Sequence, residues 1–357
     1  MKVYIKFLIY TFYRSFFYVI SIMLSLVFIL NLLNDLEFFK DIEVNIYHTL
    51  LLSLLNSPSM IFEMFPFIFL ITTQLFFIKL FTNNELEIFK YSGLKNSNIL
   101  LILSTVAIFT GIIVTLVFYN LSSNLKNIYL EIKSQYTTDG KYLAVITKNG
   151  LWIKDKIDGK IFIINSSKIE DNFLINNFIT EFDKEYNVVR NIQSKKIDMI
   201  DKEWKVYNAK IYKKNNYVFE NILNINSNFD YKRIQTLYSN LSSFNIFELF
   251  ELRENYKKMN SSLTEIDLHL LKLLSLPIYL LLMTIFSSTI MLRIKRLDST
   301  TFKISIGLFC SVIIYYISNF FFVMGNTEKI SNYSAIFIPL ILLVAINTLM
   351  MQKINDK

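Results

Sequence analysis

Long runs of apolar residues restrict this chain to the folds of a membrane protein. The first run extends from about Ser15 to Leu33, and as a helix it is long enough to cross a bilayer core of about 30 Å. Further apolar runs cover 46–78, 99–121, 268–292, 304–323 and 335–351. With 53% hydrophobic residues bunched in this way, the 357-residue chain is too apolar for one soluble domain. We expect an α-helical membrane protein with six transmembrane helices.

Prolines and polar residues predict where these helices end. The region 46–78 is too long for one straight crossing, and Pro58 and Pro66 divide it. We therefore predict an interfacial helix over 46–56 and a membrane helix after Pro58. Residues 34–45 are predicted to form an acidic loop. No small-residue cleavage site follows the first run, so we expect its helix to be uncleaved.

The segment between the third and fourth apolar runs has a different character. Short apolar pieces separated by turn-like residues predict seven strands, over 142–147, 150–154, 160–164, 173–182, 186–192, 203–212 and 217–225. We predict an all-β domain of the sandwich or jelly-roll type, with the chain divided into 1–121, 122–265 and 266–357. Some strands are apolar on both faces. Either two sheets bury both faces, or one face lines a path.

A short polar island, 82–93, lies between the second and third apolar runs. Asn84 and Glu87 fit a capping box, and Gly93 fits the left-handed residue that ends a helix. One side of the predicted helix, over 84–93, would be apolar or aromatic, with Leu86, Phe89 and Tyr91. Such a helix either docks into a groove of another protein or lies on the bilayer surface.

The short loops carry unequal positive charge. Most of their Lys and Arg residues lie on the side of the N-terminus, and only Lys40 and Lys329 lie on the other side. Because cytoplasmic loops are rich in Lys and Arg, we predict that both termini and the island are cytoplasmic. The β-domain is then predicted to lie beyond the far face of the membrane.

The residue types do not indicate a cofactor site. The single cysteine, Cys310, lies within an apolar run and is interpreted as a packing residue. His48 and His269 lie far apart with no further Cys or His nearby, so no metal site is predicted. The glycines form no phosphate-binding loop. We expect that this chain binds no cofactor.

The order of these parts resembles the LptF/LptG (YjgP/YjgQ) permease family. The segments that carry the resemblance are Asn84-Glu85-Leu86 with Ser92-Gly93, similar to the family's coupling helix, Pro58 with Pro66 at helix 2, residues 150–155 (GLWIKD), and Leu276-Pro277 at helix 4. The resemblance covers essentially the whole chain. The GLWIKD segment resembles the first strand of the β-domain in LptG, so it favours LptG over its partner LptF.

The resemblance implies a permease subunit of an ATP-driven ABC transporter that extracts lipopolysaccharide from the bacterial inner membrane. The implied partners are an LptF-like permease, an LptB-like cytoplasmic ATPase dimer that uses ATP and Mg, and an LptC-like single-span protein that leads to a periplasmic bridge. The chain itself would not be an enzyme, and its β-domain would be periplasmic.

Three alternatives remain open. They are the LptF-type role, a lipoprotein-release-type permease and a membrane scaffold without transport. A lipoprotein-release permease would have four crossings, with its large domain after helix 1. A scaffold would not need the coupling helix.

The resemblance also suggests site residues. The implied ATPase-coupling residues are Glu85, Leu86, Phe89, Ser92 and Gly93. The lateral-gate candidates on helix 5 are Gly307, Ser311, Ser318 and Asn319, which alternatively form a close-packing surface. The lipid head-group candidates are Asn31, Asn34 and Lys40, for which a solvated loop is the alternative. The candidates for a lipid path in the β-domain are Trp152 and Phe162. The family carries lysines at the outer end of helix 1, whereas Lys40 is the only nearby cation here.

Overall fold

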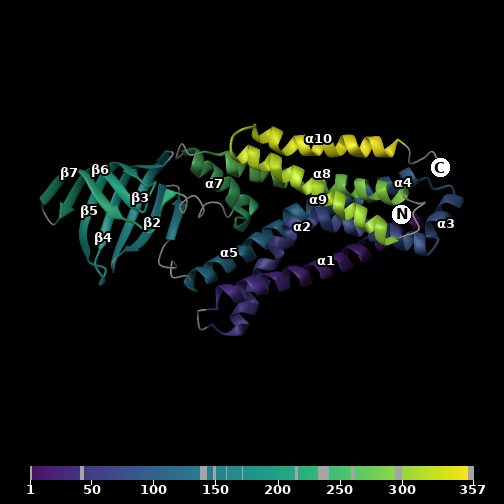
Figure 1. Cartoon of the computed structure of the whole chain (residues 1–357), viewed down its shortest axis with the longest axis horizontal. Helices are drawn as coiled ribbons and strands as arrows, with labels where there is room; N and C mark the ends of the chain where they lie inside the picture. The colour runs from purple at the N-terminus through teal and green to yellow at the C-terminus, as the bar shows by residue number, and fades with distance from the viewer. Residues whose placement is uncertain are drawn as a thin grey trace. The chain divides into compact units, whose positions relative to one another are not determined.

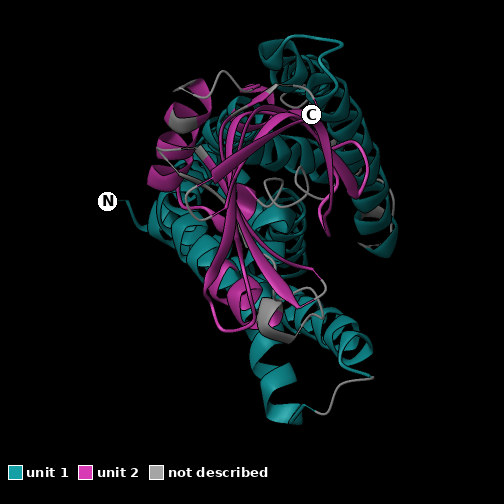
Figure 2. Cartoon of the chain, turned by 90° about the vertical axis from the view of Figure 1, so that its left-hand side faces the viewer, with its two compact units in different colours: residues 1–126, 267–357 teal, residues 127–266 magenta. Residues whose placement is uncertain are grey.

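The computed structural model describes residues 2–40, 44–136, 143–147, 150–157, 159–170, 172–213, 216–231, 241–258, 262–293 and 300–352. The chain divides into two compact units (Figures 1 and 2). One contains residues 1–126 and 267–357, and the other contains residues 127–266.

Six helices among the described residues are long and apolar enough to cross a membrane, as predicted. They comprise α1 (Val3–Phe38), α2 (Ile46–Thr82), the run of α4 (Asn96–Ile113), a π-helical segment (Val114–Phe118) and α5 (Tyr119–Tyr136), then α8 (Thr264–Arg293), α9 (Thr300–Asn326) and α10 (Asn332–Met351). A short helix, α3 (Glu85–Tyr91), lies between α2 and α4.

The second apolar region is one continuous helix, so the predicted division at Pro58 is wrong. Pro58 and Pro66 both lie inside α2, whose 37 residues extend for about 55 Å. A helix this long projects beyond a bilayer core of about 30 Å. Membrane helices tolerate proline because neighbouring helices and Ser or Thr side chains satisfy the backbone groups that it frees. Beside Pro58, the Ser57 hydroxyl donates to the Ser53 carbonyl at 2.6 Å.

Two further helix ends differ from the prediction. Helix α1 continues through 34–38, which were predicted as loop, because Asp35 is buried and accepts a hydrogen bond from Ser53 of α2 at 2.9 Å. Residues 41–43 of that predicted loop lie outside the described residues. Helix α5 continues beyond Leu121 to Tyr136. There the Ser122 hydroxyl donates to a carbonyl of its own helix at 2.8 Å, so this polar residue does not end the helix.

All seven predicted strands are present in the second unit, several of them longer than predicted. They are β1 (Leu143–Thr147), β2 (Gly150–Ile157), β3 (Lys160–Glu170), β4 (Phe173–Phe182), β5 (Val188–Asp198), β6 (Glu203–Lys213) and β7 (Asn216–Asn226). Residue 142 lies outside the described residues. The unit also contains a 3-10 turn (Leu241–Ser243) and helix α7 (Ile246–Lys258).

The strands form one antiparallel sheet in chain order, so the two-sheet sandwich considered above is not observed. Each strand pairs with the next through a short connection, a pattern that builds a single meander. The sheet is curved (Figure 2). Asn176 and Asn208 have left-handed backbones, with φ of 51° and 52°, where the strand pairing skips a residue. The register of β4 against β5 shifts between Glu181 and Phe182, and such a bulge bends a strand and increases its twist.

One face of the curved sheet carries the core of this unit. The core contains residues from β2 to β7 and the segment after β7, including Ile153, Phe162, Trp204 and Phe229. Trp204 Nε1 donates to the Phe229 carbonyl at 2.6 Å. The buried Asp155 of β2 accepts hydrogen bonds from Ser227 and Asn228, at 2.8–2.9 Å. These contacts join β2 to the segment that follows β7, which explains how one sheet encloses a core.

Candidate functional site

The N-terminus of α3 lacks the predicted capping box. Asn84 has a left-handed backbone (φ 57°), and its side chain makes no capping hydrogen bond. A capping residue normally has an extended backbone, which directs its side chain toward the first free amides. Instead, Asn83 Nδ2 donates to Glu85 Oε1 at 3.1 Å.

The C-terminus of α3 ends as predicted. Gly93 is left-handed, with φ of 81°. Its amide donates to the Lys90 carbonyl, and the Leu94 amide donates to the Phe89 carbonyl, both at 2.9 Å. This pair of bonds is a Schellman motif, and it fixes the direction in which the chain leaves the helix.

The five coupling candidates divide between the two sides of α3. Leu86 is 2% exposed, and Phe89 contacts Phe7 of α1 with ring centroids 5.9 Å apart, so both attach α3 to the helical unit. Glu85 is partly exposed, and Ser92 and Gly93 are exposed.

The sequence analysis included Tyr91 in the apolar surface that α3 presents but missed Ile88. Ile88 and Tyr91 are exposed, Tyr91 at 88%, and Ile88 was not among the predicted residues. Helical spacing could have found it, because Ile88 lies three residues before Tyr91. Ile88 lines a depression of about 770 Å³ together with Tyr4 of α1 and Asn98 of α4.

The head-group candidates on and after α1 do not share one environment. Asn31 is 2% exposed, donates to Ser57 Oγ at 3.1 Å and accepts from Asn56 Nδ2 at 3.2 Å. These bonds tie α1 to α2. Asn34 and Lys40 are exposed.

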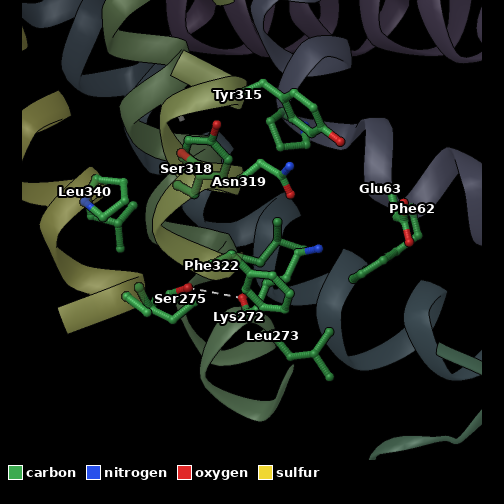
Figure 3. Close-up of a pocket in the computed structure, with 16 residues that line it drawn as sticks. Phe62, Glu63, Lys272, Leu273, Ser275, Tyr315, Ser318, Asn319, Phe322 and Leu340 are labelled. Carbon is green, nitrogen blue, oxygen red and sulfur yellow. Dashed lines mark hydrogen bonds between the residues drawn. The ribbon is translucent and has the colours of Figure 1, made fainter. Parts of the chain in front are cut away.

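The gate candidates on α9 also separate. Gly307 and Ser311 are buried, and a Cβ atom at Gly307 would lie 1.8 Å from Gln74 Nε2 of α2. Gly307 therefore allows close packing against α2. Ser318 and Asn319 instead line a cavity of about 220 Å³ between α2, α8, α9 and α10 (Figure 3).

Two charged side chains line this cavity, Glu63 of α2 and Lys272 of α8. Lys272 and Asn319 extend toward the segment of α2 that carries Glu63 (Figure 3). The sequence analysis did not single out Lys272. The available signal was its position as a lysine within an otherwise apolar run.

Trp152 and Phe162 lie on opposite faces of the sheet. Trp152 pairs with Asn165, whereas Phe162 pairs with Asp155, an odd number of residues from Trp152. Because side chains alternate along a strand, the two rings point to different faces. Trp152 is 41% exposed and Phe162 is 6% exposed. The structure therefore does not bring them together on one path.

A buried carboxylate lies near the strand ends of the sheet. Glu181 of β4 accepts hydrogen bonds from Lys160 of β3, at 2.8 Å, and from Arg190 of β5. Burial alone would raise the pKa of Glu181, but Lys160 and Arg190 outweigh it and hold this pKa below its usual value. The cluster connects three adjacent strands, which indicates a structural role.

The model of the lipopolysaccharide export system permease LptF/LptG family matches residues 6–353. The chain belongs to this family. The match includes both units, so the LptF/LptG assignment rests on the whole architecture. No curated protein matches the chain. As a member of this permease family with six membrane-spanning helices, the chain is a lipopolysaccharide export permease and an integral inner-membrane protein.

Proposed function

We propose that the chain is the LptG-type permease of an ATP-driven transporter that extracts lipopolysaccharide from the inner membrane. It pairs with an LptF-like permease and binds an LptB-like ATPase dimer. An LptC-like protein receives the lipid and passes it to a periplasmic bridge. The GLWIKD segment, at the start of β2, favours LptG over LptF.

The observation that carries the proposal is the construction of α3. Leu86 and Phe89 attach this helix to the membrane helices, the Schellman motif fixes its end, and Ile88 and Tyr91 remain exposed. An anchored helix with an exposed apolar side can transmit a partner's movement without deforming. When ATP closes the ATPase, α3 moves as a lever, and the space between the two permeases narrows around the lipid.

Co-purification tests the coupling. Glu85→Lys places a cation at the proposed ATPase contact, so it should abolish recovery of the ATPase while leaving the permease in the membrane. Glu328→Lys is the matched control, because Glu328 lies in the turn between α9 and α10. Equal ATPase recovery with Glu85→Lys and wild type would refute the role of α3.

Photo-crosslinking tests transport. Neighbouring positions on β2 sample the two faces of the sheet, since Ile153 is buried in the core and Trp152 is exposed. If the core of the β-domain opens during transport and acyl chains pass along the face that carries Phe162, a crosslinker at position 153 should capture lipopolysaccharide and one at 152 should capture little. Capture should need ATP, because each CH₂ withdrawn from the bilayer costs about 0.8 kcal/mol. ATP-independent adducts would indicate passive binding, and no adducts at either position would favour a scaffold.

A further inference from the structure

The cavity between α2, α8, α9 and α10 combines an apolar wall with charges of both signs. Leu273, Phe322 and Pro339 contribute apolar surface, and Glu63 and Lys272 contribute the charges. Among the described residues, Glu63 and Lys272 do not form a salt bridge with each other. Ionisable side chains within membrane helices are costly, so a pair that faces one cavity indicates a polar ligand there.

The charge around the cavity is more positive than these two residues alone suggest. Lys126 of α5 interacts electrostatically with Glu63, and both Lys126 and Lys272 act on His269 of α8. Lys272 Nζ also lies 5.4 Å from the centre of the Phe322 ring. Lys126 does not line the cavity, so the cavity itself offers one ammonium group and one carboxylate. An anionic ligand group is favoured beside Lys272, and a cationic one beside Glu63.

The size and depth of the cavity fit the polar end of a lipid. A volume of about 220 Å³ equals roughly seven water molecules at about 30 Å³ each, which suits a head group but not its acyl chains. Lys272 lies about two helical turns after the start of α8, and Asn319 about two turns before the end of α9. This depth is close to the end of a membrane span, where lipid head groups begin.

We propose that this cavity binds a zwitterionic lipid head group, in which a phosphate or other anion contacts Lys272 and an ammonium group contacts Glu63. The Asn319 amide, which extends into the same space, supplies a further hydrogen bond (Figure 3). The site goes beyond the transport function proposed above, and it does not depend on whether the chain exports lipopolysaccharide. The cavity also provides charged groups for lipid recognition away from α1. At the outer end of α1, Lys40 is the only nearby cation in the sequence.

Native mass spectrometry of the full-length chain in detergent tests this assignment. The probes are phosphatidylethanolamine, which carries an ammonium group, and phosphatidylglycerol with identical acyl chains, which does not. We expect phosphatidylethanolamine to bind about tenfold more tightly, the usual effect of one charge-assisted hydrogen bond. Equal binding of the two lipids to the wild-type chain would overturn the proposal.

Substitutions separate the two contacts. Glu63→Gln should remove the preference for phosphatidylethanolamine, and Lys272→Ala should weaken binding of both lipids. The matched controls are Glu37→Gln and Lys329→Ala, at exposed positions that do not line the cavity. The double exchange Glu63→Lys with Lys272→Glu should restore the preference, because a zwitterion can bind in the reverse orientation. Loss of binding in the controls as large as in the cavity variants would contradict the assignment.

The lipid that co-purifies from cells identifies the source of the head group. A phospholipid or a glycolipid that bears an amine would each support the proposed chemistry, and wild-type and Lys272→Ala chains should differ in how much they retain. A co-purified lipid without an amine, lost in Lys272→Ala but not in Glu63→Gln, would overturn it. Lipopolysaccharide capture by the β-domain is measured separately, so the transport proposal and this proposal can fail independently.

Discussion

Single small residues determine how closely the membrane helices approach. A Cβ atom at Gly111 of α4 would lie 2.9 Å from the Pro277 Cα of α8, and this backbone atom cannot move aside easily. At Gly307 the obstructing group is the end of the Gln74 side chain, which can change its conformation. The two glycines therefore differ in how much of the structure a methyl group would displace.

The first prediction compares these glycines. Gly111→Ala should lower the free energy of unfolding by about 1–3 kcal/mol, the usual cost of overpacking a core. Gly307→Ala should cost less. Titration of the helical circular dichroism with sodium dodecyl sulfate measures both. A cost at Gly111 no larger than the cost at Gly307 would contradict the prediction.

The second prediction concerns Glu181 and acid. Its pKa is lowered in the folded state, so its contribution to stability is complete above its unfolded value of about 4.5 and disappears as the pH falls through the lower folded value. The chain has two tryptophans, Trp152 and Trp204, and both lie in the β-domain. Tryptophan fluorescence during urea unfolding of the full chain therefore reports this domain alone.

Glu181→Gln should lower the stability of the β-domain by about 2 kcal/mol at pH 7, because the bonds to Lys160 and Arg190 lose their charge assistance. The difference from wild type should shrink below about pH 4.5. Asp201→Asn is a control, since Asp201 is exposed in the connection between β5 and β6. A pH-independent difference for Glu181→Gln would exclude the ionic explanation.

At the scale of the elements, substitutions in α3 can separate its attachment to the membrane helices from its proposed contact with the ATPase. Leu86→Ala should lower the thermal stability of the helical unit, at a cost of about 2–5 kcal/mol for a buried leucine. Ile88→Ala should leave stability unchanged but weaken recovery of the ATPase, because Ile88 is exposed. These different effects are the third prediction, and thermal unfolding and co-purification of both variants measure them. If only Leu86→Ala lost the ATPase, the contact with the ATPase would instead involve the side of α3 that packs against the helical unit.

The elements also show what the sequence could predict. The six helices and seven strands follow from periodicity and length, which are local properties. The ends of the helices do not, because the burial of Asp35 against Ser53 and the continuity of α2 through Pro58 depend on neighbouring helices. Gly93 was predictable because its conformation is local.

The candidate site was predictable only where one element was involved. The capping role of Asn84 failed because its backbone is left-handed. The cavity that contains Lys272 and Asn319 is formed by four helices, and no spacing in the sequence relates them to Glu63. The separation of Trp152 from Phe162 depends on strand register, which the sequence left open.

At the scale of the whole molecule, the fourth prediction is the orientation in the membrane. In a Cys310→Ser background, Asn224→Cys should react with an impermeant thiol reagent from the periplasmic side, since Asn224 is exposed on β7. Tyr91→Cys, which is exposed on α3, should react only after the inner membrane is opened. The opposite pattern would reverse the assignment of both faces, which rests on loop charge.

The chain order of the sheet also bears on how the molecule is made. Every strand pairs with the strand synthesised just before it, so the β-domain can assemble one hairpin at a time while later residues are still on the ribosome. The hydrogen bond to Asp155 forms late in this order, because its donor Ser227 follows 72 residues later in the chain. The hydrogen bonds that this buried carboxylate accepts from Ser227 and Asn228 can therefore form only after the last strand has been made.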